Sequence, residues 1–220
     1  MKRADVVSVR NLLSGRSRFR VGSVRRAFSW GPAEVAQLLV DLETSSAVEP
    51  DDDVEERFYL GPITISRAHG GAHILHDGQQ RLAVITMALC FARDRVTLPR
   101  ARKMLDKMLV HRSMFGAPEP RLRLSPEDHA WFAHFILAPG ATMRIPQQAP
   151  IGSPTNLLLA ARFMEQAFEG YSIDDLHRMI EFIALHTAVV RSVADVESED
   201  EPQLAAPDTA VESHYRIAAE

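Results

Sequence analysis

Residues 72–91 read AHILHDGQQRLAVITMALCF, and this stretch decides the fold. His73 to His76 predict a strand, Asp77-Gly78 predicts a sharp turn, and a helix is expected from about Gln79. That helix has an apolar stripe of Leu82, Ile85, Ala88 and Leu89. A strand that turns directly into a helix brings the unpaired N–H groups of the first helical turn next to the turn residues.

The segments before this stretch predict an α+β fold. Residues 58–65 form a second strand, which pairs with 73–76 across a turn at 68–71. A helix starts at Pro32, and its apolar face carries Val35, Leu38, Leu39 and Leu42. We expect a short helix or turn at 6–13, an extended segment or loop from Arg18 to Arg26, and a loop at 44–56.

From about residue 99 the sequence predicts a helical chain, with a late strand only at 187–190. Helices are expected around 104–109, from Ser125, at 156–168 and from Ser172. The Pro- and Gly-rich stretch 139–154 is expected to be a loop. We therefore divide the chain into a small mixed sheet with helices at 1–95, a helical extension at 96–195, and an acidic tail at 196–220 that we expect to be disordered.

The net charge of −4 hides a strong asymmetry. Residues 1–30 hold eight basic residues and one acid, whereas 31–60 hold nine acids and one base, and 194–220 hold eight acids and one base. A basic N-terminal arm of this kind can meet nucleic-acid phosphates, and its candidate contacts are Arg16, Arg18, Arg20 and Arg25. The alternative is that acidic and basic segments neutralise each other within the fold.

Composition also argues against several classes of protein. The single cysteine, Cys90, cannot form an internal disulfide, and its apolar surroundings predict a buried small side chain. His73 and His76 would face opposite sides of a strand, which makes them poor joint metal ligands. No apolar run reaches the roughly 18 residues of a membrane helix, and no signal peptide is recognisable, so we expect a cytoplasmic protein.

The turn at 77–81 carries the residues that can bind a ligand or take part in catalysis: Asp77, Gly78, Gln79, Gln80 and Arg81. The start of a helix accepts phosphate readily, and an arginine there can add a forked, charge-assisted contact. The carboxylate of Asp77 can hold Mg²⁺ or orient an attacking water. The alternative is that Asp77 only caps the helix and Arg81 is a solvated side chain.

The run FYLGPI at 58–63 followed by DGQQRL at 77–82 resembles the N-terminal domain of GmrSD-type modification-dependent restriction endonucleases. The family pattern is Tyr-Phe-Leu-Gly-x-Ile, a hairpin, and then Asp-Gly-Gln-Gln-Arg-Leu. Upstream, Arg26, Phe28 and Trp30 fall on matching positions, as do Leu38-Leu39-Val40-Asp41 and, later, 121–124. The family's Pro, Tyr and Gln are replaced here by Gly22, Val24 and Arg25. The resemblance covers roughly residues 15–135.

This resemblance implies a ParB/sulfiredoxin-like core that binds and hydrolyses a nucleoside triphosphate, GTP or ATP, with Mg²⁺. Carried over by position, Asp77, Gly78, Gln79, Gln80 and Arg81 form the nucleotide site, with Arg26 assisting. Asp77, Gln79, Gln80 and Arg81 are then the catalytic candidates, and Asp77 is the metal ligand. The replaced Tyr and Gln remove a stacking surface and an amide contact, while Arg25 adds a phosphate contact.

The family takes part in sensing modified DNA in anti-phage defence, which makes DNA a candidate partner. No His-Asn-His-like nuclease pattern is present, so we expect a nuclease either to lie on a separate subunit or to be absent. Two alternatives stay open. The first is a non-catalytic DNA-binding or adaptor protein that uses the basic arm, and the second is a truncated homologue with a purely structural role.

Overall fold

The structure is a computed structural model, and it describes residues 3–22, 27–48, 58–114 and 116–194. Its centre is a six-stranded mixed sheet in the order β1-β8-β3-β4-β2-β7. The strands are β1 (Arg3–Ser8), β2 (Arg18–Val21), β3 (Phe58–Arg67), β4 (Ala72–Asp77), β7 (Leu122–Arg123) and β8 (Thr187–Val193). The prediction of an α+β fold with a mixed sheet is confirmed.

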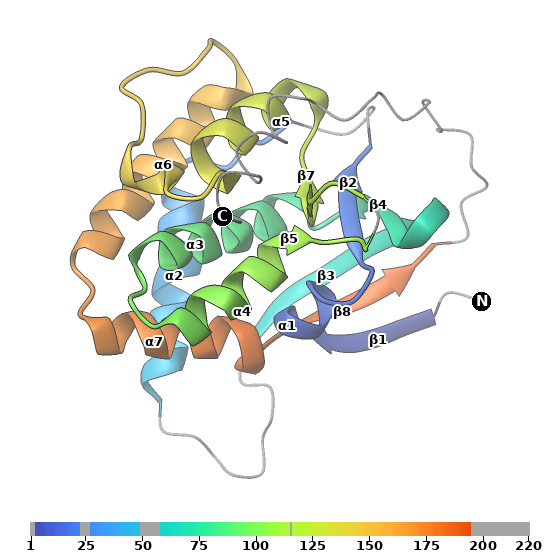
Figure 1. The fold of residues 1–220 in the computed structure, drawn as a ribbon, viewed down its shortest axis with the longest axis horizontal. Coiled ribbons are helices and arrows are strands. Elements are labelled where there is room, and N and C mark those ends of the chain that lie inside the picture. Colours follow the sequence, from blue (N-terminus) through green and yellow to red (C-terminus); the bar gives the residue numbers. More distant parts are fainter. Residues whose placement is uncertain (1–2, 23–26, 49–57, 115, 195–220) are drawn as a thin grey trace.

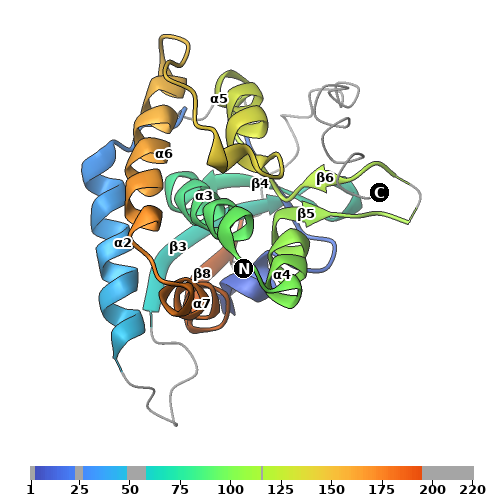
Figure 2. The same ribbon diagram turned by 60° about the vertical axis from the view of Figure 1, so that its left-hand side comes forward.

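The helices α2 to α7 gather on one side of this sheet (Figures 1 and 2). Their bounds are α2 (Pro32–Ala47), α3 (Gln79–Arg95), α4 (Pro99–Leu109), α5 (Pro126–Phe132), α6 (Ser153–Glu169) and α7 (Ile173–Glu181). The one-turn helix α1 (Val9–Leu12) follows β1, and β5 (Val110–His111) pairs with β6 (Glu119–Pro120) in a separate hairpin. Helices α5 and α7 continue into the π-helical segments η2 (Ala133–Leu137) and η4 (Phe182–His186). Two short 3-10 helices are η1 (His69–Gly71) and η3 (Ala141–Met143).

Helix α3 is the centre of the helical layer. Every residue from Leu82 to Arg93 is buried, so the expected apolar stripe is in fact a helix buried all round. Its neighbours are α4, α6, α7, η2 and η3, which enclose it on the side away from the sheet. A helix apolar on every face belongs in the core, and this position fixes the first turn of α3 against the end of β4.

Most of the predicted helix starts are confirmed, and local chemistry explains them. Pro32 occupies the first turn of α2, and the Glu34 carboxylate accepts a hydrogen bond from the N–H of Gly31 at 3.0 Å. Ser172 and Asp175 form a reciprocal capping box at α7. The strands expected at 58–65, 73–76 and 187–190 are present as β3, β4 and β8.

The expectation of a chain that is helical after residue 99 apart from one short strand is wrong. β5, β6 and β7 all lie in this part of the chain, and β8 runs to Val193 and sits between β1 and β3. The central sheet therefore contains two strands, β7 and β8, from the segment for which we expected a helical extension. The short helix or turn expected at 6–13 is present as α1 over Val9–Leu12 only. Residues 6–8 belong to strand β1 instead, because β8 supplies an antiparallel partner for them.

The remaining differences are small. The expected loop at 44–56 is helical as far as Ala47, and 49–57 lie outside the described residues. The loop expected at 139–154 contains only the short turn η3 before α6 begins at Ser153. The acidic tail after residue 194 also lies outside the described residues. Among the helices that the structure describes, none is long and apolar enough to span a membrane.

Candidate functional site

The turn between β4 and α3 is held by Gly78, which has a φ of 86° and forms the N-cap of α3. No side chain caps this helix, so the alternative in which Asp77 is its cap is wrong. The Asp77 side chain is 62% exposed, and it accepts no hydrogen bond from the backbone N–H groups at the start of α3. The first-turn N–H groups of α3 therefore lack a side-chain acceptor at a surface-accessible turn.

Gly78 is required by packing as well as by its backbone angle. A Cβ atom at this position would lie 2.6 Å from Ile63 Cγ2 and 3.1 Å from the Pro62 carbonyl oxygen. Both atoms belong to β3, so the first turn of α3 can approach the sheet this closely only at a glycine. The close approach of β3 therefore explains why residue 78 is a glycine.

Arg81 links the turn to β3. Its Nη1 donates to the Leu60 carbonyl oxygen at 3.0 Å, and Nη2 lies 3.9 Å from the Asp77 carboxylate. The guanidinium occupies the place where any side chain at Gly61 would be, and Gly61 has a φ of 101°. The glycine of the 58–63 run and the arginine of the 77–82 run thus form one contact in the structure.

The two neighbouring glutamines have different surroundings. Gln80 Oε1 accepts from the Ser29 N–H, and its Nε2 donates to the Ala27 carbonyl oxygen, both at 3.1 Å. Gln79 Oε1 is buried and has no hydrogen-bond partner. The amide of Gln80 is thus already used within the protein, whereas that of Gln79 is not.

Two further residues hold the same upstream segment, and the sequence analysis missed both. Asp128 Oδ2 accepts from the Phe28 N–H at 2.6 Å and from the Ser125 hydroxyl at 2.9 Å. Asn156 Nδ2 donates to the Phe28 carbonyl oxygen at 3.2 Å. Asp128 is 1% exposed, and its Oδ1 has no partner. The only sequence signal was a helix start at Ser125, which accounts for an acid there without any long-range contact.

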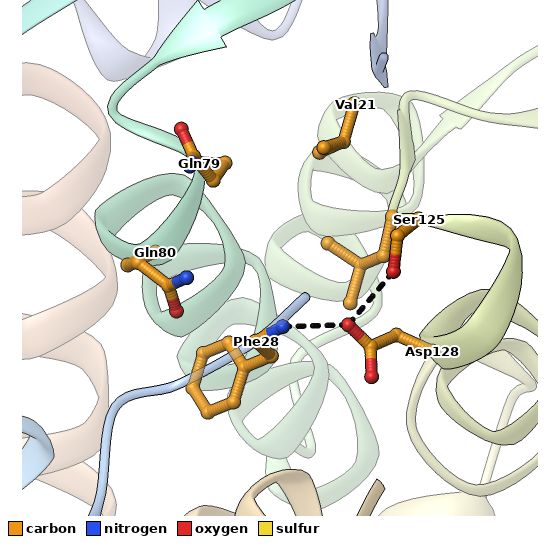
Figure 3. Close-up of a pocket in the computed structure, with 7 residues that line it drawn as sticks. Val21, Phe28, Gln79, Gln80, Ser125 and Asp128 are labelled. Atoms are coloured by element: carbon orange, nitrogen blue, oxygen red, sulfur yellow. Dashed lines mark hydrogen bonds between the residues drawn. The ribbon is translucent and has the colours of Figure 1, made fainter. Parts of the chain in front are cut away.

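These residues surround a small pocket between the first turn of α3 and the start of α5 (Figure 3). The lining residues are Val21, Phe28, Gln79, Gln80, Leu124, Ser125 and Asp128. The space inside is on the scale of a single water molecule. A nucleoside does not fit within it in this conformation, so a ligand of that size must lie at the surface of the turn.

The arginines of the basic arm are distributed along one end of the sheet. Arg18 donates to Glu119 at 2.9 Å, whereas Arg20 lies beside Arg123 on the neighbouring parallel strand β7. Arg16 is exposed, and Arg25 and Arg26 lie outside the described residues. The sequence analysis did not single out Arg123, because its neighbour in space is a hundred residues away along the chain.

Cys90 has no place in this site. It is fully buried on α3, and burial raises the pKa of its thiol to about 12. A thiol that stays protonated at neutral pH is a poor nucleophile, which agrees with the expectation of a buried small side chain.

A comparison with protein-family models matches residues 9–202 to the GmrSD restriction endonuclease, N-terminal domain. The chain belongs to the GmrSD N-terminal domain family. A search among curated proteins gave no significant match. The family match includes the turn at 77–81, the segment around Phe28, and both Asp128 and Asn156.

The GmrSD N-terminal domain thus includes β8, which pairs with both β1 and β3. Strand β1 precedes the matched range, yet it pairs with β8 from Arg3↔Val193 to Ser8↔Ala188. The segment 96–195 therefore contributes β7 at one edge of the sheet of this GmrSD N-terminal domain, and β8 next to the other edge, which β1 forms.

Proposed function

We propose that this GmrSD N-terminal domain binds a nucleoside triphosphate at the turn between β4 and α3 and hydrolyses it with Mg²⁺. The observation that carries the proposal is the start of α3, a long buried helix with no side-chain cap, flanked by Arg81 and Asp77. Unpaired N–H groups and the positive end of the helix dipole favour an anion at this place. The family membership, which is that of a restriction endonuclease domain, supports the proposal.

Arg81 would bind the phosphates. Its Nη1 contact with Leu60 holds the guanidinium in one orientation, and its other N–H groups remain for a forked contact with phosphate oxygens. Phosphoryl transfer needs chiefly positioning and electrostatic stabilisation, which an arginine fixed beside a helix start supplies. Gln79, whose amide oxygen has no partner, would orient the ligand or a water.

Asp77 would hold the metal ion. No three His, Cys, Asp or Glu side chains among the described residues are grouped to bind a metal by themselves. Mg²⁺ in triphosphate sites uses one or two carboxylates together with phosphate oxygens and waters, so a single exposed carboxylate beside the turn fits that role. When bound, the ion would neutralise charge on the phosphates.

The first test measures binding of fluorescent ATP and GTP analogues and release of phosphate in the presence of Mg²⁺. Arg81→Ala should weaken binding by about 10- to 100-fold, as expected for loss of a charge-assisted hydrogen bond. Asp77→Ala should reduce phosphate release more than binding. Arg178→Ala on α7, an exposed arginine paired with Asp175, is the matched control. A folded wild type that binds neither analogue would refute the proposal.

Gly61→Ala tests whether Arg81 must lie where it does. The new methyl group would overlap Arg81 Nη1, and the flexible arginine would move away from Leu60. We expect triphosphate binding to weaken about tenfold, close to the effect of Arg81→Ala. In a Gly61→Ala/Arg81→Ala double variant the two losses should not add, because both remove the same contact. Full additivity would show that Gly61 acts in another way.

A second candidate function is binding of DNA phosphates at the β2–β7 end of the sheet. Arg20 and Arg123 are neighbours on parallel strands, and neither makes a hydrogen bond or ion pair with another described residue. Two cations side by side, without an acidic partner in the described part of the chain, repel each other and favour a shared anion. This arrangement supports the interpretation of a DNA-binding or adaptor protein, with Arg16 nearby on the chain.

The salt dependence of DNA binding tests this second candidate. Each phosphate contact contributes a slope of about 0.9 in a plot of log affinity against log salt, so Arg20→Ala/Arg123→Ala should reduce the slope by about 2. The charge-matched control is Arg100→Ala/Lys103→Ala on the exposed face of α4. An unchanged slope in the first variant would exclude this surface as the DNA contact.

A further inference from the structure

The backbone of residues 27–29 is held by side chains of three helices. Gln80 of α3 bonds to Ala27 and Ser29. Asp128 of α5 accepts from the N–H of Phe28, and Asn156 of α6 donates to its carbonyl oxygen. The partners are 51 to 128 positions apart in sequence. Figure 3 shows Phe28 bonded to Asp128, with Gln80 on the adjacent first turn of α3. We call Gln80, Asp128 and Asn156 the clamp.

The clamp replaces the secondary structure that this segment lacks. Residues 27–31 belong to no helix or strand, and the Phe28 side chain is only 4% exposed. Backbone groups this close to the core need hydrogen-bond partners, and here side chains supply them. Both the N–H and the carbonyl group of Phe28 are bonded to clamp residues. The segment is therefore fixed by the clamp and not by strand pairing.

The clamp separates the roles of the two glutamines in the turn. The Gln80 amide uses one oxygen lone pair on the Ser29 N–H and one N–H on the Ala27 carbonyl oxygen, and these two contacts fix its orientation toward residues 27–29. Gln79, by contrast, lines the pocket with a buried, unpartnered oxygen. Gln79 is thus expected to hold a water in this pocket, and Gln80 to affect the turn only through residues 27–29.

We propose that the clamp residues Gln80, Asp128 and Asn156 are positioning residues. They hold Ala27, the residue after Arg26, at a fixed position relative to the turn at 77–81. This inference rests on the proposed function, because this position matters only if a triphosphate binds at that turn. Asp128 is the strongest member, since a carboxylate accepts from two donors here and such charge-assisted bonds are about twice as strong as neutral ones.

Hydrogen exchange and triphosphate binding together test the clamp. Gln80→Leu and Asp128→Ala should raise exchange of the amides of Phe28 and Ser29 at least about tenfold and weaken binding of a fluorescent GTP or ATP analogue by about tenfold. Asp128→Asn keeps an acceptor oxygen and should restore both properties toward the wild type. Asn156→Ala, at a half-buried side chain, is the mildest variant and should change both in the same direction.

The matched control is Asp94→Ala. Asp94 is also a buried carboxylate on α3 that accepts from loop N–H groups, but its partners are Gly140 and Thr142. It should lower stability without changing exchange at Phe28 and Ser29 or triphosphate affinity at temperatures where the variant is folded.

Three outcomes would overturn the inference. If Gln80→Leu weakens binding without faster exchange at Ser29, Gln80 contacts the ligand itself. If exchange rises but affinity stays constant, the clamp is a purely structural element. If the wild type binds no triphosphate, the proposed function fails and the positioning role fails with it, whereas exchange in the variants still reports whether the clamp holds the segment.

Discussion

Gly78→Ala is expected to lower the free energy of unfolding by about 2–4 kcal/mol, from backbone strain and overpacking together. The backbone at Gly78 has a φ of 86°, which a residue with a Cβ adopts only at a cost. The added methyl would also meet Ile63 Cγ2 at 2.6 Å and the Pro62 carbonyl oxygen, and a backbone oxygen of a central strand cannot move aside easily. Urea unfolding followed by circular dichroism measures the change.

Gly140→Ala distinguishes backbone strain from overpacking as the cause of the lost stability. Gly140 has a similar φ of 77°, but no atom lies within 4 Å of the place where its Cβ would be. Gly140→Ala should therefore lower the free energy of unfolding only through backbone strain, by about 1 kcal/mol. If the two variants lose the same stability, the contact between the turn and β3 contributes nothing, and Gly78 is needed for its backbone angle alone.

The hairpin and helix around residue 77 were predictable because their determinants are local. Turn residues and apolar spacing within one short stretch are enough to predict β4, Gly78 and the start of α3. Strand β1 depends instead on Val6 and Val7, which lie opposite Val190 and Val189. A short Val-rich run is equally compatible with a helix or a strand, and only the distant partner decides between them.

In the candidate site, too, only residues that are contiguous in the sequence could be proposed in advance. The five residues at 77–81 were found as a motif, and the structure gives Arg81, Gln79 and Gln80 their separate surroundings. Asp128 and Asn156 could not be found, because their contacts with Phe28 cross 100 and 128 positions of sequence. An acid in the first turn of a helix is already explained by capping and dipole effects, so nothing in the sequence indicates that Asp128 also contacts Phe28. The assisting role of Arg26 stays a prediction.

Arg93→Met should be the most destabilising of these substitutions. Arg93 is 2% exposed, and it donates to the carbonyl oxygens of Leu137 and Ala138 at 2.8 and 2.9 Å and to the Asp94 carboxylate at 2.8 Å. Methionine fills much of the same volume but has no donor. The variant would leave Asp94 as a buried charge without its cation, and such breaks cost about 3–5 kcal/mol.

The expected consequence of Arg93→Met is a lower urea midpoint together with faster exchange around η2 and η3, where the freed carbonyl groups lie. Arg178→Met is the control, because the Arg178–Asp175 pair is exposed on both sides and an exposed pair contributes at most about 1 kcal/mol. An Arg93→Met/Asp94→Asn variant should recover part of the stability, since the neutral amide still has an oxygen to accept from Gly140 and Thr142 but leaves no unpaired buried charge. If the double variant is no more stable than Arg93→Met, the loss comes from the carbonyl groups of Leu137 and Ala138 and not from Asp94.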